Sequence, residues 1–107
     1  MSLWRTAPVQ DHPVVRLVDW KIIRVTAGDE DTIHFVGFDQ DNREGRVSSA
    51  ISQLHRSSEN EMVGITSTGR EYRAQGAQGT NSESEYVLVR WVKLNGLSEG
   101  DISLFQE

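Results

Sequence analysis

The sequence predicts an α+β domain, mainly β, with about five antiparallel strands in a curled meander or partly open small barrel and one C-terminal helix packed against it. Three observations support this prediction. Apolar residues alternate at period two along several short segments, glycine-containing turns separate these segments, and one late segment has helical periodicity with capping signals at both ends. We therefore expect one small β-rich domain at residues 14–107, preceded by an extended N-terminal arm at residues 1–13.

Composition limits the classes of protein to which the chain can belong. Its 107 residues suffice for one hydrophobic core. The chain has no cysteine, which excludes disulfides, cysteine metal ligands and a thiol nucleophile. No apolar run approaches the roughly 18 residues of a membrane helix, and the N-terminus lacks the basic-then-apolar pattern of a signal peptide. We expect a soluble, cytoplasmic protein that does not contact a membrane.

The charge balance disfavours nucleic acid as a partner. The net charge is −5, from 11 basic and 16 acidic side chains. Phosphate backbones attract clusters of lysine and arginine, and the sequence contains no such cluster.

The arm at residues 1–13 contains Pro8 and Pro13, which favour extended backbone and disfavour helix. It also contains Trp4, whose ring carries a large apolar surface. We expect Trp4 to dock on its own domain, because terminal arms are commonly held down by one such residue. The alternative is that Trp4 anchors a partner or a second copy.

The first strand region spans residues 14–27 and is rich in β-branched side chains. Its apolar residues do not keep one parity. Either both faces of the strand are covered, or a bulge near Asp19 resets the register. We expect a short strand or turn at residues 14–18 and the main strand at 20–26.

A tight acidic turn at residues 28–31 joins this region to a strand at 32–39, in which Gly37 predicts a bulge or a sharp bend. Three adjacent carboxylates in the turn would suit a divalent cation only if further ligands converged on them, so we interpret it as a solvated hairpin loop. A polar turn follows at residues 40–45, and it departs from the calcium-loop pattern at the positions that require Asx and glycine.

The next two segments differ in how clearly they predict structure. Residues 46–55 alternate like a strand but also contain a short helical stripe, and the flanking turns favour strand. Residues 62–76 alternate on both sides of a break at 67–70, and Gly69 suits the positive φ that such a hairpin turn requires. This hairpin is the clearest structural signal in the chain.

The late helix is predicted at about residues 83–95. Ser82 and Glu85 match a capping box at its start, after a mobile, linker-like loop at residues 76–84. Gly96 suits a left-handed C-terminal cap. The rival interpretation of this segment is a buried strand, because its valines also alternate.

A short closing strand is expected at residues 101–105. It would end the chain beside the sheet, with Ile102 and Leu104 facing the same way.

No catalytic, cofactor or metal site is predicted. The sequence has no nucleophile elbow, phosphate loop or dinucleotide fingerprint. His12, His34 and His55 are far apart and lack metal-ligand spacing. We interpret His34 as a packed histidine among apolar neighbours, and we expect the protein not to be an enzyme.

The candidate site is an interaction surface. Five side chains combine the aromatic and guanidinium chemistry of interface hot spots: Trp4, Arg70, Tyr72, Arg73 and Arg90. We expect a protein partner or a second copy of the chain, contacted near Arg73 and the 76–84 loop. A small-molecule-binding barrel is the alternative function, and an enzyme whose site is assembled only by folding ranks below it.

Structural tests separate these functions. A carrier would have a deep aromatic cavity containing Phe35, Phe38, Tyr72 and Trp91. A nucleic-acid module would have a basic stripe formed by Arg46, Arg70, Arg73 and Arg90. An enzyme would place His34 or His55 beside a carboxylate in a cleft.

Overall fold

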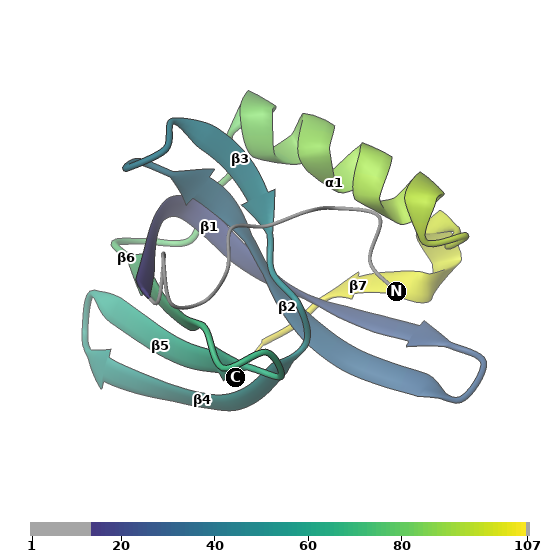
Figure 1. Ribbon diagram of the computed structural model, residues 1–107, viewed down its shortest axis with the longest axis horizontal. Coiled ribbons are helices and arrows are strands. Elements are labelled where there is room, and N and C mark those ends of the chain that lie inside the picture. The colour runs from purple at the N-terminus through teal and green to yellow at the C-terminus, as the bar shows by residue number, and fades with distance from the viewer. Residues whose placement is uncertain (1–13, 107) are drawn as a thin grey trace.

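The computed structural model describes residues 14–106, which form seven strands, one α-helix and one 3-10 helix (Figure 1). The elements are β1 (Val14–Ala27), β2 (Glu30–Asp39), β3 (Glu44–Val47), β4 (Ile51–Ser58), β5 (Glu61–Thr66), β6 (Glu71–Gln75), α1 (Ser82–Leu94), η1 (Glu99–Asp101) and β7 (Ile102–Leu104). The predicted fold class is confirmed: the domain is mainly β, and one C-terminal helix packs against the sheet. It contains more strands than the sequence predicted.

The strands form one mixed sheet in the order β3-β2-β1-β6-β5-β4, with β7 paired to β1. Within the described residues, the sheet does not close into a barrel. Neighbouring strands are antiparallel except at β1 and β6, where Val14–Leu17 runs parallel to Glu71–Ala74. The expected meander contains no such parallel pair. The pair forms because β1 is long, so that its first residues reach β6 while the rest of the strand pairs with β2 and β7. The first half of β1 lies between β2 and β6, and its second half lies between β2 and β7.

Both alternatives predicted for residues 14–27 occur, because β1 has a bulge near Asp19 and is covered on both faces. The register between β1 and β2 shifts between Val18 and Lys21, and Asp19 has a φ of 48°. The two expected segments are therefore one bulged strand. Gly37 lies opposite the bulge, where a Cβ atom would be 3.0 Å from Cβ of Trp20. The irregularity is thus in β1, and Gly37 leaves room for it.

Two hydrophobic clusters cover the two faces of the β1–β2 pair. One consists of Val15, Leu17, Trp20, Ile22, Phe35, Met62, Tyr72 and Ala74. The other has Ile23, Val25 and Val36 at its centre, with residues of α1 and the C-terminal segment packed against them. Consecutive residues such as Ile22 and Ile23 face opposite clusters, as expected for a strand covered on both faces.

The predicted hairpin is confirmed by β5 and β6, which pair from Glu61–Gln75 to Ile65–Glu71. Gly69 in its turn has a φ of 90°. The ambiguous segment at 46–55 is extended rather than helical, but it divides between β3 and β4. At the division, the backbone N–H of Ser48 donates to the carbonyl of Phe35, and its hydroxyl accepts from the N–H of Phe35.

The predicted helix is confirmed at Ser82–Leu94, but its N-cap is not the predicted one. Asn81 is the cap, and its Oδ1 accepts from the N–H groups of Glu83 (2.8 Å) and Ser84 (3.3 Å). Ser82 is already helical, so it cannot cap. At the other end Gly96 has the expected positive φ of 67°.

The start of α1 lies directly against β3. A Cβ atom on Gly45 would come within 2.4 Å of the carbonyl oxygen of Glu83. Only glycine allows this approach of helix backbone to strand. The predicted closing strand is confirmed as β7, which pairs with Ile23–Val25 of β1. No helix in residues 14–106 is long and apolar enough to span a membrane.

Candidate interaction surface

The structure does not place the five predicted interface residues on one surface. Trp4 lies outside the described residues. Arg70 and Tyr72 are buried, with 3% and 2% of their surface exposed. The Tyr72 ring stacks on Phe35 with the ring centroids 5.6 Å apart. Tyr72 is therefore a core residue in this fold, and it offers no side chain to a partner.

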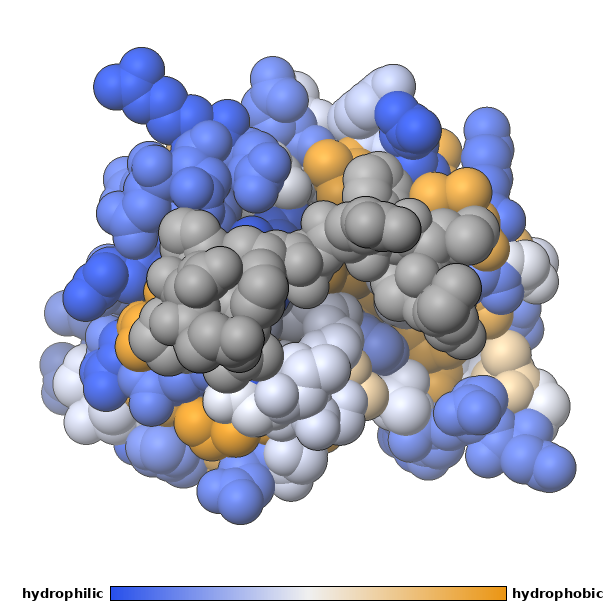
Figure 2. All heavy atoms as spheres, viewed as in Figure 1, coloured by the Kyte–Doolittle hydropathy of each residue, from blue (hydrophilic) through white to orange (hydrophobic). Residues whose placement is uncertain are grey.

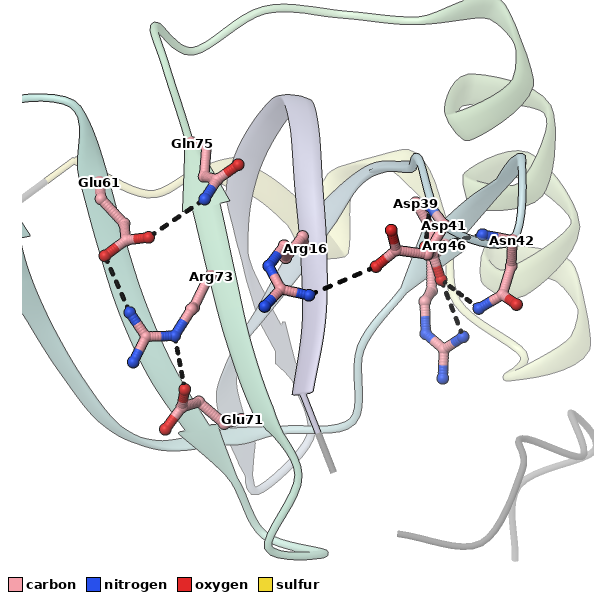
Figure 3. A network of polar contacts seen from close by, with 9 residues as sticks. All are labelled: Arg16, Asp39, Asp41, Asn42, Arg46, Glu61, Glu71, Arg73 and Gln75. Carbon is pink, nitrogen blue, oxygen red and sulfur yellow. Dashed lines mark hydrogen bonds and ion pairs between the residues drawn. The ribbon is translucent and has the colours of Figure 1, made fainter. Parts of the chain in front are cut away.

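A buried polar group surrounds the Tyr72 hydroxyl. That hydroxyl accepts a hydrogen bond of 3.0 Å from Nε of Arg46. Nη1 of Arg46 lies 3.5 Å from Oδ2 of Asp39 and 3.6 Å from Oε1 of Glu44. Asp39 also accepts from the backbone and side-chain N–H groups of Asn42, which shapes the β2–β3 turn (Figure 3). Two carboxylates thus face Arg46, while its Nη2 is buried and makes no hydrogen bond within the described residues.

Arg73 is half-buried and lies between two acidic side chains (Figure 3). Its Nε donates to Glu71 at 2.7 Å and its Nη1 to Glu61 at 3.0 Å. The Glu71 carboxylate raises the pKa of Arg73, and Glu61 adds to this effect. Hydrogen bonds from Ser57, then from Gln75, lower the pKa of Glu61. The charge of Arg73 is thus neutralised within its own sheet face.

The basic stripe that a nucleic-acid module would require is not present among the described residues. Arg16 is the cross-strand neighbour of Arg73 and faces Asp41, with Nη1 and Oδ2 3.6 Å apart. Arg46 and Arg70 are buried. Acidic groups alternate with the remaining exposed cations on this face, so it lacks the positive field that a phosphate backbone requires.

The predicted loop at residues 76–84 ends at residue 81, because α1 begins at Ser82, and Trp20 holds this loop to the core. The indole Nε1 donates to the carbonyl of Gly76 at 3.1 Å. The N–H of Gly79 donates to the carbonyl of Trp20 at 2.9 Å, and Gln78 forms a β-bridge with Trp20. These contacts position the start of α1 on the sheet.

Helix α1 combines a core-facing side with an apolar outer side. Leu88 and Trp91 pack on the second hydrophobic cluster. Within the helix only Ser84 is buried, whereas Tyr86 is 62% exposed and Val89 54% exposed. Hydrophobic residues reach the surface in the region of α1, beside hydrophilic ones (Figure 2).

Arg90 is the predicted interface residue that the structure places on this outer side. Its guanidinium carbon lies 5.8 Å from the centroid of the Tyr86 ring, within cation–π range. We define the outer face of α1 as the exposed residues Ser82, Glu83, Tyr86, Val89, Arg90 and Lys93. Aromatic and guanidinium groups therefore meet here, as they do at interface hot spots.

The sequence prediction missed Tyr86 and Val89 as surface residues. The apolar stripe that helical periodicity predicts for this segment runs through Val87, Leu88, Trp91, Val92 and Leu94, with Arg90 and Lys93 opposite it. The signal that would have found the two residues is their helical spacing, because Tyr86 and Val89 share a face with Arg90.

The described histidines do not meet a carboxylate. Nδ1 of the buried His34 lies 2.9 Å from the carbonyl of Ser48, and Nε2 lies 2.8 Å from the hydroxyl of Thr32. Burial lowers the pKa of His34. The ring also contacts Trp91 edge-on, with the centroids 4.9 Å apart. His55 is exposed on β4.

The aromatic residues expected to line a carrier cavity do not share one space. Phe35 and Tyr72 pack together in the first cluster, whereas Trp91 packs against the second, on the other face of β1 and β2. Among residues 14–106, no group of three or more His, Asp or Glu side chains could hold a metal ion.

Comparison of the chain with protein-family models, with curated proteins and with solved structures found no match.

Proposed function

We propose that the protein is a non-enzymatic interaction or regulatory module that contacts other protein chains through the outer face of α1. The observation that carries this proposal is the exposure of Tyr86 (62%) and Val89 (54%) on a helix whose other side already packs on the sheet. Singly exposed apolar residues are ordinary. Here an exposed tyrosine, an exposed valine and an arginine lie on adjacent turns of one helix, and tyrosine and arginine are enriched in protein interfaces.

The remaining surfaces support the proposal less well. On the sheet face around Arg73, the arginine is paired with Glu61 and Glu71, and desolvating these groups would cost free energy that a partner would have to replace. The 76–84 loop is tied to Trp20. On the outer face of α1, by contrast, the two large apolar side chains Tyr86 and Val89 are already exposed and carry no charge that a partner would have to desolvate.

Site-specific photo-crosslinking tests the proposal in cells of the organism of origin. A photo-reactive residue would replace Tyr86 or Val89, and matched controls would carry it at the exposed positions Asp29 and Ser58. We expect discrete protein adducts from positions 86 and 89 that are missing from positions 29 and 58. Equal labelling at all four positions, or no adduct at 86 and 89, would contradict the proposal.

A further inference from the structure

The outer face of α1 has the spacing of a helix-pairing seam. Four exposed residues follow one another at intervals of four, three and four positions: Ser82, Tyr86, Val89 and Lys93. On an α-helix this spacing places side chains in one line, as at the a and d positions of a coiled coil. The two large apolar members, Tyr86 and Val89, lie in the middle of the line.

The charges beside this seam are arranged with opposite signs at its two ends. Glu83 lies in the first turn of α1, and Arg90 lies seven positions later on the same flank. Lys93 adds a second cation in the last turn. The face is therefore acidic at its start, apolar at its centre and basic at its end.

We propose that a second copy of this chain covers this face, with the two α1 helices packed antiparallel. A two-fold axis through the apolar centre would place Tyr86 and Val89 of both copies against one another. It would also bring Glu83 of each copy to Arg90 of the other, because residues seven positions apart share a flank in an antiparallel pair. The two helix dipoles would also run in opposite directions, so that the N-terminus of each helix lies near the C-terminus of the other.

The alternative orientation is less favourable on the same residues. In a parallel pair Lys93 would face Lys93 of the second copy, and Glu83 would be far from Arg90. Like charges in register repel, whereas the antiparallel arrangement forms two opposite-charge pairs. This inference rests on the proposed function, since it uses the same face, and it adds the identity of the partner.

The size of the seam sets the expected affinity between the two copies. One helix face from each copy buries less than the roughly 1,200 Å² of a standard interface, so the association should be transient. We expect a dissociation constant between about 10 µM and 1 mM. Sedimentation velocity of the full chain over this concentration range would show a concentration-dependent shift from monomer to dimer. A monomer throughout the range would overturn the inference.

A charge swap tests the antiparallel geometry. Glu83→Arg and Arg90→Glu should each weaken dimerisation about tenfold or more, because each substitution turns two attractive contacts into repulsive ones. The double variant carrying both should restore it. If the double variant dimerises no better than the single ones, the antiparallel pairing is wrong.

Two controls accompany the swap. Glu59→Arg makes the same charge change at an exposed turn and should leave dimerisation unchanged. Thermal unfolding of every variant separates dimer loss from helix loss, since Glu83 also favours the helix N-terminus. Arg90→Glu is the informative single variant if Glu83→Arg unfolds the helix.

The crosslinking and sedimentation results together separate the two proposals. A monomer whose positions 86 and 89 crosslink to a different protein would support the proposed function and overturn the self-pairing. A monomer without such crosslinks would overturn both. Crosslinks between two copies, lost in the single charge variants and recovered in the double variant, would support both.

Discussion

The two hydrophobic clusters of this small domain differ in how completely they are covered. In the first cluster, the side chains of Leu17, Phe35, Met62 and Ala74 are fully buried. In the second, the α1 side chains that pack on the sheet, Leu88 and Trp91, remain half-exposed. The first cluster is enclosed by strands from both halves of the chain, whereas the second is covered by α1 together with Val47, Leu97 and Ile102.

This difference shows which part of the fold buries its apolar side chains and which part leaves apolar surface exposed. Strands β1, β2, β5 and β6 bury their inward side chains against one another, so a partner has nothing to add there. Helix α1 presents apolar residues on the side turned from the sheet as well as on the side that packs on it. Apolar area left in water is a source of binding free energy once it is covered.

The largest expected effect is in the enclosed cluster. Phe35→Ala should lower the free energy of unfolding by about 3–5 kcal/mol, because it removes a fully buried ring that packs on Tyr72 and Trp20. Trp91→Ala is the comparison in the second cluster, and it should cost less because Trp91 is already half-exposed. Urea unfolding measures both. A larger loss for Trp91→Ala would reverse the comparison.

Gly45→Ala should perturb the attachment of α1 rather than the enclosed cluster. The added Cβ would lie 2.4 Å from the Glu83 carbonyl, so the helix start must move away from β3. We expect a loss of roughly 1–3 kcal/mol, as for other overpacked contacts. Hydrogen exchange should show reduced protection in α1 and unchanged protection in β5 and β6. Gly28→Ala cannot serve as the control for crowding by an added methyl group. Gly28 has a φ of 60°, so alanine would be strained there even with space around it.

The pH dependence of stability should reveal the burial of His34, between β2 and α1. Its pKa in the folded protein is lowered from the ordinary 6.5, so the unfolded chain binds the proton more readily. Stability should therefore fall as the pH decreases below about 6.5, by at most about 1.4 kcal/mol per pH unit, and level off once the folded form is protonated.

Urea midpoints of the wild type and His34→Gln at about pH 7.5 and pH 5.5 measure this contribution. The wild type should lose more stability between the two pH values than the variant does. His55→Gln, at an exposed position on β4, is the control for replacing a histidine side chain. If the stability of His34→Gln changed with pH as much as that of the wild type, His34 would not report on the packing of α1.

The smallest expected effect concerns Arg73 on the polar sheet face. Arg73→Gln removes a pair of partly exposed ion pairs with Glu61 and Glu71, and such pairs contribute little because water screens them. The shift in thermal midpoint should be smaller than for any substitution above, and dimerisation through α1 should be unchanged. Weaker dimerisation of Arg73→Gln would move the contact surface from α1 to the sheet.

Much of the local structure was predictable because it depends on neighbouring residues. Alternation around Gly69 predicted the β5–β6 hairpin, and the capped, helically periodic segment predicted α1. The N-cap was displaced by one residue because Asn81 and Ser82 are both good caps, and only the backbone conformation distinguishes them. The change of parity near Asp19 was compatible with a bulge or with two covered faces, and β1 has both.

The candidate site was much less predictable. Tyr72 and Arg73 are adjacent in one strand, so their side chains point to opposite faces of the sheet, but the sequence alone does not say which elements cover each face. The fold turns Tyr72 toward Phe35 and leaves Arg73 outside. Likewise, sequence periodicity assigns Leu88 and Val89 to one apolar helix, but it does not say which side the sheet covers.

By itself, the sequence determined the β5–β6 hairpin, the closing strand β7 and the helix of this protein, because alternation, glycine conformational freedom and capping act within a few residues. Tertiary structure alone decided the parallel pairing of β1 with β6, the burial of Arg46 and Arg70, and the exposure of Tyr86 and Val89. Those outcomes depend on which distant elements come together, here β3 and the start of α1 at Gly45. Contacts between residues far apart in the chain leave no periodic signal in a single sequence, and they settle which side chains a partner can reach.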